Sequence, residues 1–135
     1  MKSTLAPGLA ATVRIEIDRD RTIDFMGEQA RVYATPMLVR DVEFACRNLL
    51  LEHLDPGEDS VGTRVEIDHV AATLLGMTAT LIVTVVGVKG RAVTFDVVGS
   101  DGVEPICRGR HGRFVVDVAT TGQRLAAKAK KAGLA

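Results

Sequence analysis

The strongest pattern of apolar and polar positions lies in residues 36–54, PMLVRDVEFACRNLLLEHL, and it predicts a helix. Val39, Glu43, Cys46 and Leu50 follow the spacing i, i+4, i+7, i+11, so they share one helix face. Three of them are apolar and the fourth is a carboxylate. Because an unpaired buried carboxylate is costly, Glu43 either reaches water at the edge of the helix, finds a partner, or takes part in chemistry.

The same helix carries a second apolar stripe, formed by Leu38, Val42, Ala45 and Leu49. A helix that is apolar on more than one side needs to be covered by a sheet or by a partner chain. Thr35 is predicted to be its N-cap and Pro36 its first helical residue. The turn-forming residues 55–57, Asp-Pro-Gly, are predicted to stop it.

Period-2 alternation predicts strands in the rest of the chain, over residues 10–17, 63–73, 77–88, 91–100 and 103–116. Lys89-Gly90 and Asp101-Gly102 are two-residue hairpin signals between the last three of these segments. We therefore expect the last four strands to form an antiparallel meander.

These elements predict one α+β domain over residues 1–135, in which the long helix lies across one face of a curved antiparallel sheet. This is the hot-dog arrangement. Residues 18–34 are irregular and long for a connection, which predicts a lid-like loop, and residues 120–135 predict a tail with a short helix. A sheet that wraps one helix keeps an open edge, so we expect a homodimer and leave higher association open.

Composition excludes several classes of function. The formal net charge is zero, so no broad basic surface for nucleic acid is expected. No run approaches the roughly 18 apolar residues of a membrane span, and the first residues lack the apolar core of a signal peptide. Cys46 and Cys107 lie far apart in apolar contexts, which favours reduced thiols in a cytoplasmic protein. No histidine or cysteine spacing resembles a metal site, so no metal or cofactor is expected.

His69, like Glu43, is an ionisable residue at a position where the pattern predicts an apolar side chain. Alternation places it with Val65, Ile67 and Ala71, on the face that points toward the helix. An inward histidine is either a satisfied core residue or a catalytic group. Together with Glu43 in the same layer, it could orient an imidazole or activate a nucleophile or a water molecule.

Thr35 is a third candidate, with two interpretations. It is either a helix cap or an attacking hydroxyl that lies beside free backbone N–H groups at the positive end of a helix dipole. Eight residues at about 1.5 Å each place it about 12 Å from Glu43 along a straight helix. We therefore expect a working site to be completed across a dimer interface, or by a bend before the helix.

Weaker candidates surround these three. Gly62 is either an ordinary loop glycine or a point where a substrate approaches the backbone closely. Arg108, Arg110 and Arg113 flank His111 and could hold a phosphate, although for Arg108 and Arg110 we favour an exposed edge protected by charge. Possible pocket-lining residues in the irregular segment are Phe25, Met26 and Tyr33.

Three segments carry a family resemblance: ATPMLVRDVEFAC, LDPGEDSVGTRVEIDHVAATLLGMTATLIVTV and SDGVEPICRGRHGRFVV. Over about residues 33–116 the chain resembles the hot-dog thioesterases related to fluoroacetyl-coenzyme A thioesterase. The most specific part is the ordered set PGEDSVGT, HVAAT and GMT, followed by a D-G hairpin and G-x-H-x-R.

The resemblance implies catalysis by Thr35, Glu43 and His69, with Gly62 at the thioester and coenzyme A and Arg113 in contact with substrate. It implies hydrolysis of a short- or medium-chain acyl-coenzyme A, in which coenzyme A belongs to the substrate and no further cofactor is needed. Either Thr35 or Glu43 attacks the acyl carbon, or Glu43 and His69 activate water.

Two departures limit the resemblance. The segment before the threonine is several residues shorter than the lid of the fluoroacetate enzyme, and Pro36 stands where that enzyme has glycine. Discrimination for fluorine is therefore not carried over to this chain. A hot-dog hydratase or dehydratase and a non-catalytic acyl-coenzyme A binding module remain as alternatives.

Overall fold

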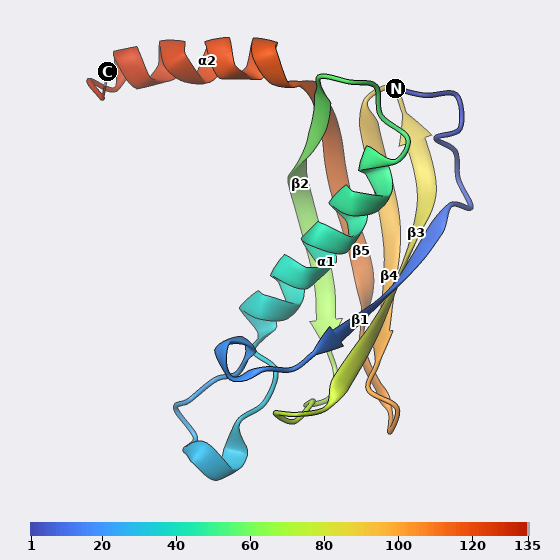
Figure 1. The fold of residues 1–135 in the computed structure, drawn as a ribbon, viewed down its shortest axis with the longest axis vertical. Helices are drawn as coiled ribbons and strands as arrows, with labels where there is room; N and C mark the ends of the chain where they lie inside the picture. Colours follow the sequence, from blue (N-terminus) through green and yellow to red (C-terminus); the bar gives the residue numbers. More distant parts are fainter. Residues whose placement is uncertain (135) are drawn as a thin grey trace.

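A five-stranded antiparallel sheet curves around one long helix in the computed structural model, which describes residues 1–134 (Figure 1). The helix is α1, Thr35–Leu51. The strands are β1 Ala10–Glu16, β2 Glu58–His69, β3 Thr78–Lys89, β4 Ala92–Ser100 and β5 Pro105–Asp117, and a second helix, α2, spans Val118–Lys131. Two short 3-10 turns, Arg19–Arg21 and Glu28–Ala30, lie in the loop before α1. The predicted α+β hot-dog arrangement is confirmed.

The strand order is β1-β3-β4-β5-β2, which corrects the prediction of a four-strand meander. Strands β3, β4 and β5 do follow one another, but β2 pairs with β5 at the far edge and not with β3. The connection over residues 70–77 is too long for a tight hairpin. It crosses the end of the sheet and is held there by the loop, since Tyr33 N donates to Thr73 O and Leu75 N to Arg31 O.

The core lies between α1 and the inner face of the sheet. All four residues of the second apolar stripe, from Leu38 to Leu49, are buried, as are Cys46 and Leu50 of the first stripe. They pack in one cluster with the inward side chains of the sheet, among them Leu81, Val83, Phe95 and Val97. At about 25 cal/mol per Å² of apolar area, this burial is the main force that holds α1 inside the curve.

Helix α1 begins one residue earlier than predicted, so the assignment of Thr35 as N-cap is wrong. Ala34 is the N-cap and makes no side-chain cap bond, while Thr35 and Pro36 occupy the first two helical positions. The Thr35 hydroxyl bonds instead to a residue at the end of β2. A tertiary contact has therefore overridden the local capping preference of threonine.

Strand β2 forms a free edge of the sheet. It begins five residues before the predicted start because its pairing with β5 extends from Glu58 to His69. Its inward residue Val65 is 42% exposed, and Phe44 of α1 is also exposed, whereas Val61 is exposed on the outer face, where it pairs with Phe114. The helix therefore leaves the apolar side chain of Val65 uncovered at this edge.

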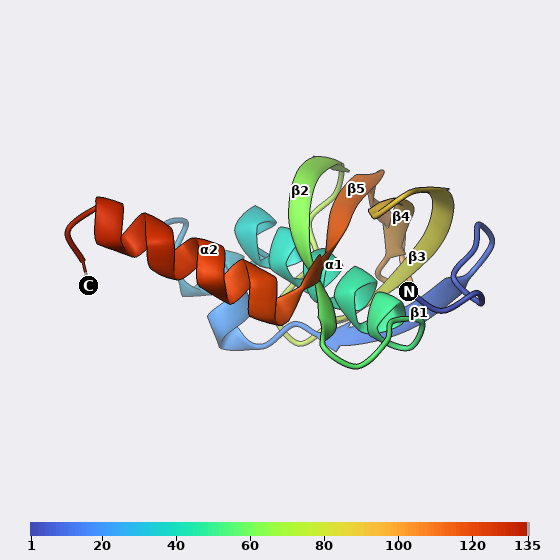
Figure 2. The same ribbon diagram turned by 90° about the horizontal axis from the view of Figure 1, so that it is seen from above.

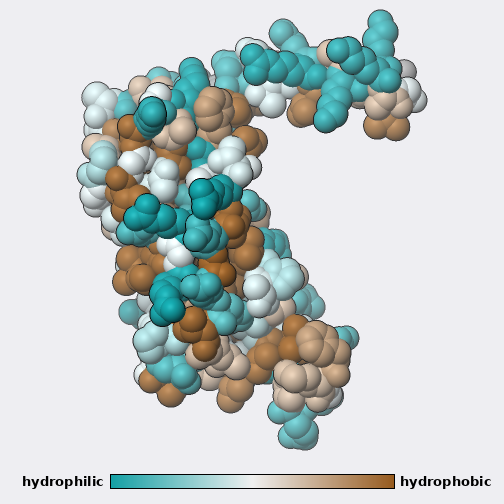
Figure 3. Space-filling model, turned by 180° about the vertical axis from the view of Figure 1, so that it is seen from behind, coloured by the Kyte–Doolittle hydropathy of each residue, from teal (hydrophilic) through white to brown (hydrophobic). Residues whose placement is uncertain are grey.

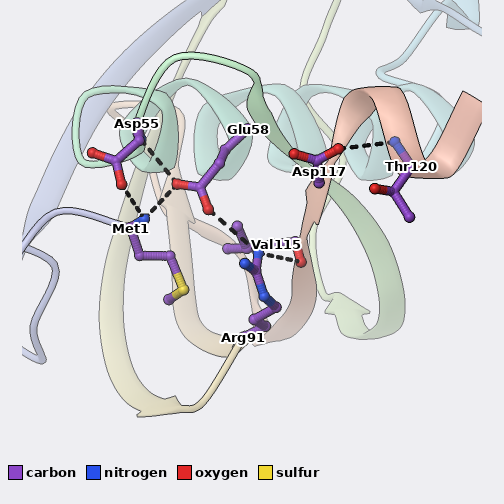
Figure 4. Close-up of polar contacts among 7 residues, drawn as sticks. All are labelled: Met1, Asp55, Glu58, Arg91, Val115, Asp117 and Thr120. Carbon is purple, nitrogen blue, oxygen red and sulfur yellow. Dashed lines mark hydrogen bonds and ion pairs between the residues drawn. The ribbon is translucent and has the colours of Figure 1, made fainter.

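Helix α2 follows β5 directly and projects past β2 away from the sheet (Figures 1 and 2). It begins at Val118, two residues before the predicted helical tail of residues 120–135, because Asp117 caps it by accepting from Thr120 N (Figure 4). None of its side chains is buried. Within residues 1–134 the structure contains no helix long and apolar enough to cross a membrane.

Polar contacts close the end of the sheet where α2 begins (Figure 4). The amino group of Met1 donates to Asp55 at 2.6 Å and to Glu58 at 2.5 Å, and Arg91 donates to Glu58 at 3.3 Å. Since Asp55 lies just after α1 and Glu58 begins β2, these contacts hold the turn between the two elements.

Substitution of Gly109 tests the β2–β5 pairing. A Cβ there would overlap the Glu66 carbonyl oxygen and lie 2.7 Å from Ile67 Cα, both of them backbone atoms that cannot turn away. We expect Gly109→Ala to lower the free energy of unfolding by about 3 kcal/mol in urea denaturation. Gly122→Ala is the matched control because its Cβ would meet nothing within 4 Å, and it should stabilise by about 0.5 kcal/mol. Equal effects of the two variants would contradict the pairing.

Candidate active site

Thr35 and His69 form a direct pair, although 34 positions separate them in the chain. Thr35 Oγ1 lies 2.8 Å from His69 Nδ1. The threonine is the first residue of α1 and the histidine the last residue of β2, so the packing of α1 on β2 brings them together. Such a hydroxyl–imidazole contact has the geometry of a nucleophile and its general base.

The two ring nitrogens of His69 have different surroundings. Nε2 is buried and has no hydrogen-bond partner among residues 1–134, whereas Nδ1 faces the Thr35 hydroxyl. Burial lowers the pKa of His69 below its ordinary value, so the ring is neutral at neutral pH. In the tautomer with the proton on Nε2, Nδ1 is free to accept the proton of Thr35.

Tyr33 supports the ring of His69 from one side. The two rings meet edge to face, with centroids 6.2 Å apart and planes at 80°. The Tyr33 hydroxyl donates to Asp41, which also accepts from Arg21 Nε at 2.9 Å and Nη2 at 3.1 Å. Burial and the neighbouring Asp41 raise the pKa of Tyr33, so the phenol remains a donor. This network ties the loop before α1 to the helix and fixes the ring that touches His69.

The Thr35–His69 pair opens into a pocket of about 570 Å³. Its walls are mainly apolar and come from the loop, the start of α1 and residues 70–72, with Ile23, Phe25, Val32, Tyr33 and Val70 as the larger side chains. Of the three residues predicted as possible pocket lining, Phe25 and Tyr33 lie at this pocket, whereas Met26 is not among its lining residues and is 55% exposed. Ile23 and Val32 are ordinary apolar residues of the irregular segment and Val70 is one of a predicted strand, so the sequence does not mark them as pocket residues.

Glu43 lies away from this pair, over Gly62 on β2. A Cβ added to Gly62 would overlap Glu43 Oε1 and lie 3.3 Å from His111 Cε1. The glycine therefore leaves the space that the carboxylate occupies. Within residues 1–134 no hydrogen bond joins Glu43 to Thr35 or His69, which agrees with a separation of about 12 Å along a straight helix.

Arg113 is buried beside Glu43 and is 5% exposed. Its Nε donates to Ser60 Oγ at 2.7 Å, its Nη2 to Ser60 O at 2.8 Å, and its Nη1 to His111 Nε2 at 3.1 Å. Burial lowers the pKa of Arg113, and the charge of Glu43 opposes that shift. Glu43 and Arg113 also line a cavity of about 90 Å³.

The other arginines of β5 point to the opposite face of the sheet. Arg110 pairs with Asp96 at 3.0 Å, and Arg108 lies 3.8 Å from Asp68. These cross-strand pairs replace the predicted protected edge, because β5 lies inside the sheet between β4 and β2. The sequence did not separate Arg113 from its neighbours, although period-2 alternation places His111 and Arg113 together on the inner face.

The outer face of the sheet alternates between apolar and charged areas (Figure 3). It contains a hollow of about 400 Å³ whose lining includes Ile82, Val98 and Arg108. Its lining residues include no hydroxyl–imidazole pair like that of Thr35 and His69.

Comparison with known proteins shows the family of the chain. Residues 17–119 match the family described as fluoroacetyl-CoA-specific thioesterase. The chain belongs to this family. A family relative, the fluoroacetyl-CoA thioesterase of Streptantibioticus cattleyicolor, is 38% identical over 89 residues, which are 66% of this chain and 64% of that protein. The matched region thus spans just under two thirds of the relative.

Solved structures of the family superpose closely on the chain. A mutant of the fluoroacetyl-CoA-specific thioesterase FlK is 29% identical, with a TM-score of 0.86 over 94% of this chain and 99% of FlK. A complex of an FlK mutant with fluoroacetate and CoA is 30% identical, with a TM-score of 0.80 over 87% of this chain and 99% of the other. A thioesterase superfamily member from Thermus thermophilus has a TM-score of 0.88 over 98% of this chain and 99% of its own at 23% identity, which supports the fold alone.

The half-buried His69 and the buried His111 predict how stability depends on pH. Burial lowers the pKa values of His69 and His111, so below pH 6.5 the unfolded chain binds more protons than the folded one. We therefore expect the free energy of unfolding to fall on acidification from pH 6.5 to 5.5, by roughly 1 kcal/mol. Urea unfolding at pH 7.5, 6.5 and 5.5 measures this, with His69→Gln as the variant that should weaken the dependence. Stability that rises on acidification in this window would contradict the assignment.

Proposed function

We propose that the protein is an acyl-CoA thioesterase, which hydrolyses a short- or medium-chain acyl-coenzyme A to the free acid and coenzyme A. The observation that carries the proposal is the Thr35 Oγ1–His69 Nδ1 contact of 2.8 Å at a mainly apolar pocket. Membership of the fluoroacetyl-CoA-specific thioesterase family supports the same chemistry. The apolar walls suit an acyl group, and the open mouth leaves coenzyme A at the surface.

In the proposed reaction Thr35 attacks the thioester carbon while His69 Nδ1 takes the hydroxyl proton. The resulting oxyanion forms beside the N-terminus of α1, whose dipole favours negative charge. The carbon–sulfur bond then breaks, and His69 returns the proton to the leaving sulfur of coenzyme A. Water, deprotonated by His69, then adds to the threonyl ester. The bond between the acyl carbon and Thr35 Oγ1 breaks, His69 returns the proton to that oxygen, and the acid is released.

In this scheme the Glu43 carboxylate of each site is supplied by the second chain of a dimer. We infer a homodimer in which the free edges of two β2 strands pair in antiparallel fashion about a twofold axis. The exposed apolar side chains of β2 support this pairing, with Val65 on the inner face and Val61 on the outer face of the edge strand. With Gly62 opposite the partner subunit's His69, Glu43 of one chain lies near the Thr35–His69 pair of the other. There the carboxylate stabilises the imidazolium or orients the water.

The two cysteines support a cytoplasmic location. Cys46 and Cys107 are free and buried, and burial raises their pKa values to about 12 and about 11. Such thiols are protonated and shielded at neutral pH, so they need no disulfide partner.

Release of thiol from a panel of acyl-coenzyme A substrates tests the activity. We expect turnover by the wild type, and losses of about 100- to 10,000-fold in kcat/KM for Thr35→Ala, Glu43→Ala and His69→Ala. His53→Ala is the matched control: it removes an imidazole that bonds Thr4 far from the pocket, and it should keep wild-type activity. A wild type that binds coenzyme A but releases no thiol from any acyl chain is a binding module, and turnover of an enoyl substrate in its place identifies a hydratase.

Mixing two inactive variants tests the shared site. In a heterodimer of Glu43→Ala and His69→Ala chains, one of the two composite sites keeps all three side chains. Random exchange of subunits should therefore restore about a quarter of wild-type activity. A site built within one chain would gain no activity from mixing. Mixtures that remain inactive despite proven subunit exchange would therefore contradict the assignment of Glu43 to the partner's site.

A further inference from the structure

Arg113 differs from the paired arginines of the chain in the nature of its partners. Arg21 and Arg47, for example, donate to Asp41 and Asp59. Arg113 instead directs its bonds to a serine hydroxyl, a backbone carbonyl and an imidazole, all of which are neutral. A buried guanidinium held by neutral acceptors keeps its full positive charge available to a further neighbour.

Glu43 is that neighbour. The charged or ionisable groups that act on Arg113 are Glu43, Cys46 and Arg47 from α1 and Asp59 from β2. Asp59 is held by Arg47 at 2.7 Å, and burial keeps Cys46 protonated. Glu43 is therefore the one carboxylate of this group that has no ion pair within residues 1–134.

The tautomer of His111 follows from the direction of its hydrogen bonds. A guanidinium can only donate, so the bond from Arg113 Nη1 requires His111 Nε2 to carry no proton. His111 Nδ1 lies 2.8 Å from the backbone oxygen of Arg64, which can only accept, so Nδ1 carries the proton. The ring is thus neutral and bridges the backbone of β2 to the guanidinium. A second proton would remove the acceptor and set two cations side by side.

We propose that His111 is a positioning residue of the thioesterase, which in its neutral Nδ1–H form fixes the Arg113 guanidinium against Glu43. The Glu43 carboxylate is thereby held in place beside Gly62, where His111 Cε1 forms the adjacent wall. The importance of this for catalysis rests on the proposed function. The assignment of the tautomer rests on the hydrogen bonds alone.

The first test reads the tautomer in the wild-type protein. Nitrogen-15 NMR of the imidazole nitrogens should show a protonated Nδ1 and a bare Nε2 for His111 at pH 7, with resonances assigned by loss in His111→Gln. A proton on Nε2, or a doubly protonated ring, would overturn the proposal. This result does not depend on activity, so it tests the tautomer even where the wild type releases no thiol.

The second test separates positioning from a structural role. We expect His111→Leu to lower kcat about 10- to 100-fold with KM within about twofold. His111→Gln should recover most of that loss, because its amide can accept from Arg113 and donate to the Arg64 carbonyl. His53→Leu is the control for loss of an imidazole elsewhere and should leave the kinetics unchanged.

A double-mutant cycle completes this test. If His111 acts through Arg113 on Glu43, His111→Leu should cost less than about twofold once Glu43→Gln is present. Losses that multiply in full, or a raised KM with unchanged kcat, would overturn the proposal. The first outcome indicates a structural role, and the second indicates that Arg113 binds substrate and does not act on Glu43.

Discussion

The burial of α1 within the curve of the sheet is the constraint on which the other features depend. Two apolar stripes bury one side of the helix against the sheet, while Arg40, Phe44 and Asn48 on the other side face solvent, so its register against β2 is fixed. That register places Thr35 at the end of β2 and Glu43 over Gly62. Since the rise of a helix cannot be compressed, the polar groups of one chain fall into two separate places.

The sequence predicted the elements well because periodicity is a local signal. The long helix, the strands and the inward side of His69 all follow from spacing within about a dozen residues. The position of β2 could not be predicted in this way, because its pairing with β5 joins residues about 40 to 60 positions apart and leaves no local trace. The sequence also assigned the Thr35 hydroxyl to the helix backbone, whereas in the fold a histidine 34 residues away competes for it.

Glu43 illustrates both the strength and the limit of such an argument. Its place in an apolar stripe correctly marked it as unusual, and the space above Gly62 explains how it is accommodated. The identity of its neighbours was not predictable. Ser60, His111 and Arg113 come from the two strands under the helix, and only their pairing register brings them to one point.

The importance of Gly62 lies in its lack of a Cβ atom. The carboxylate of Glu43 occupies the volume where a Cβ would stand, and even the smallest side chain would displace it. Position 62 should thus tolerate substitution as poorly as a position that supplies a reacting group, although it donates no functional group at all. Across related sequences, loss of this glycine would mark chains in which the carboxylate has moved, well before any catalytic residue had changed.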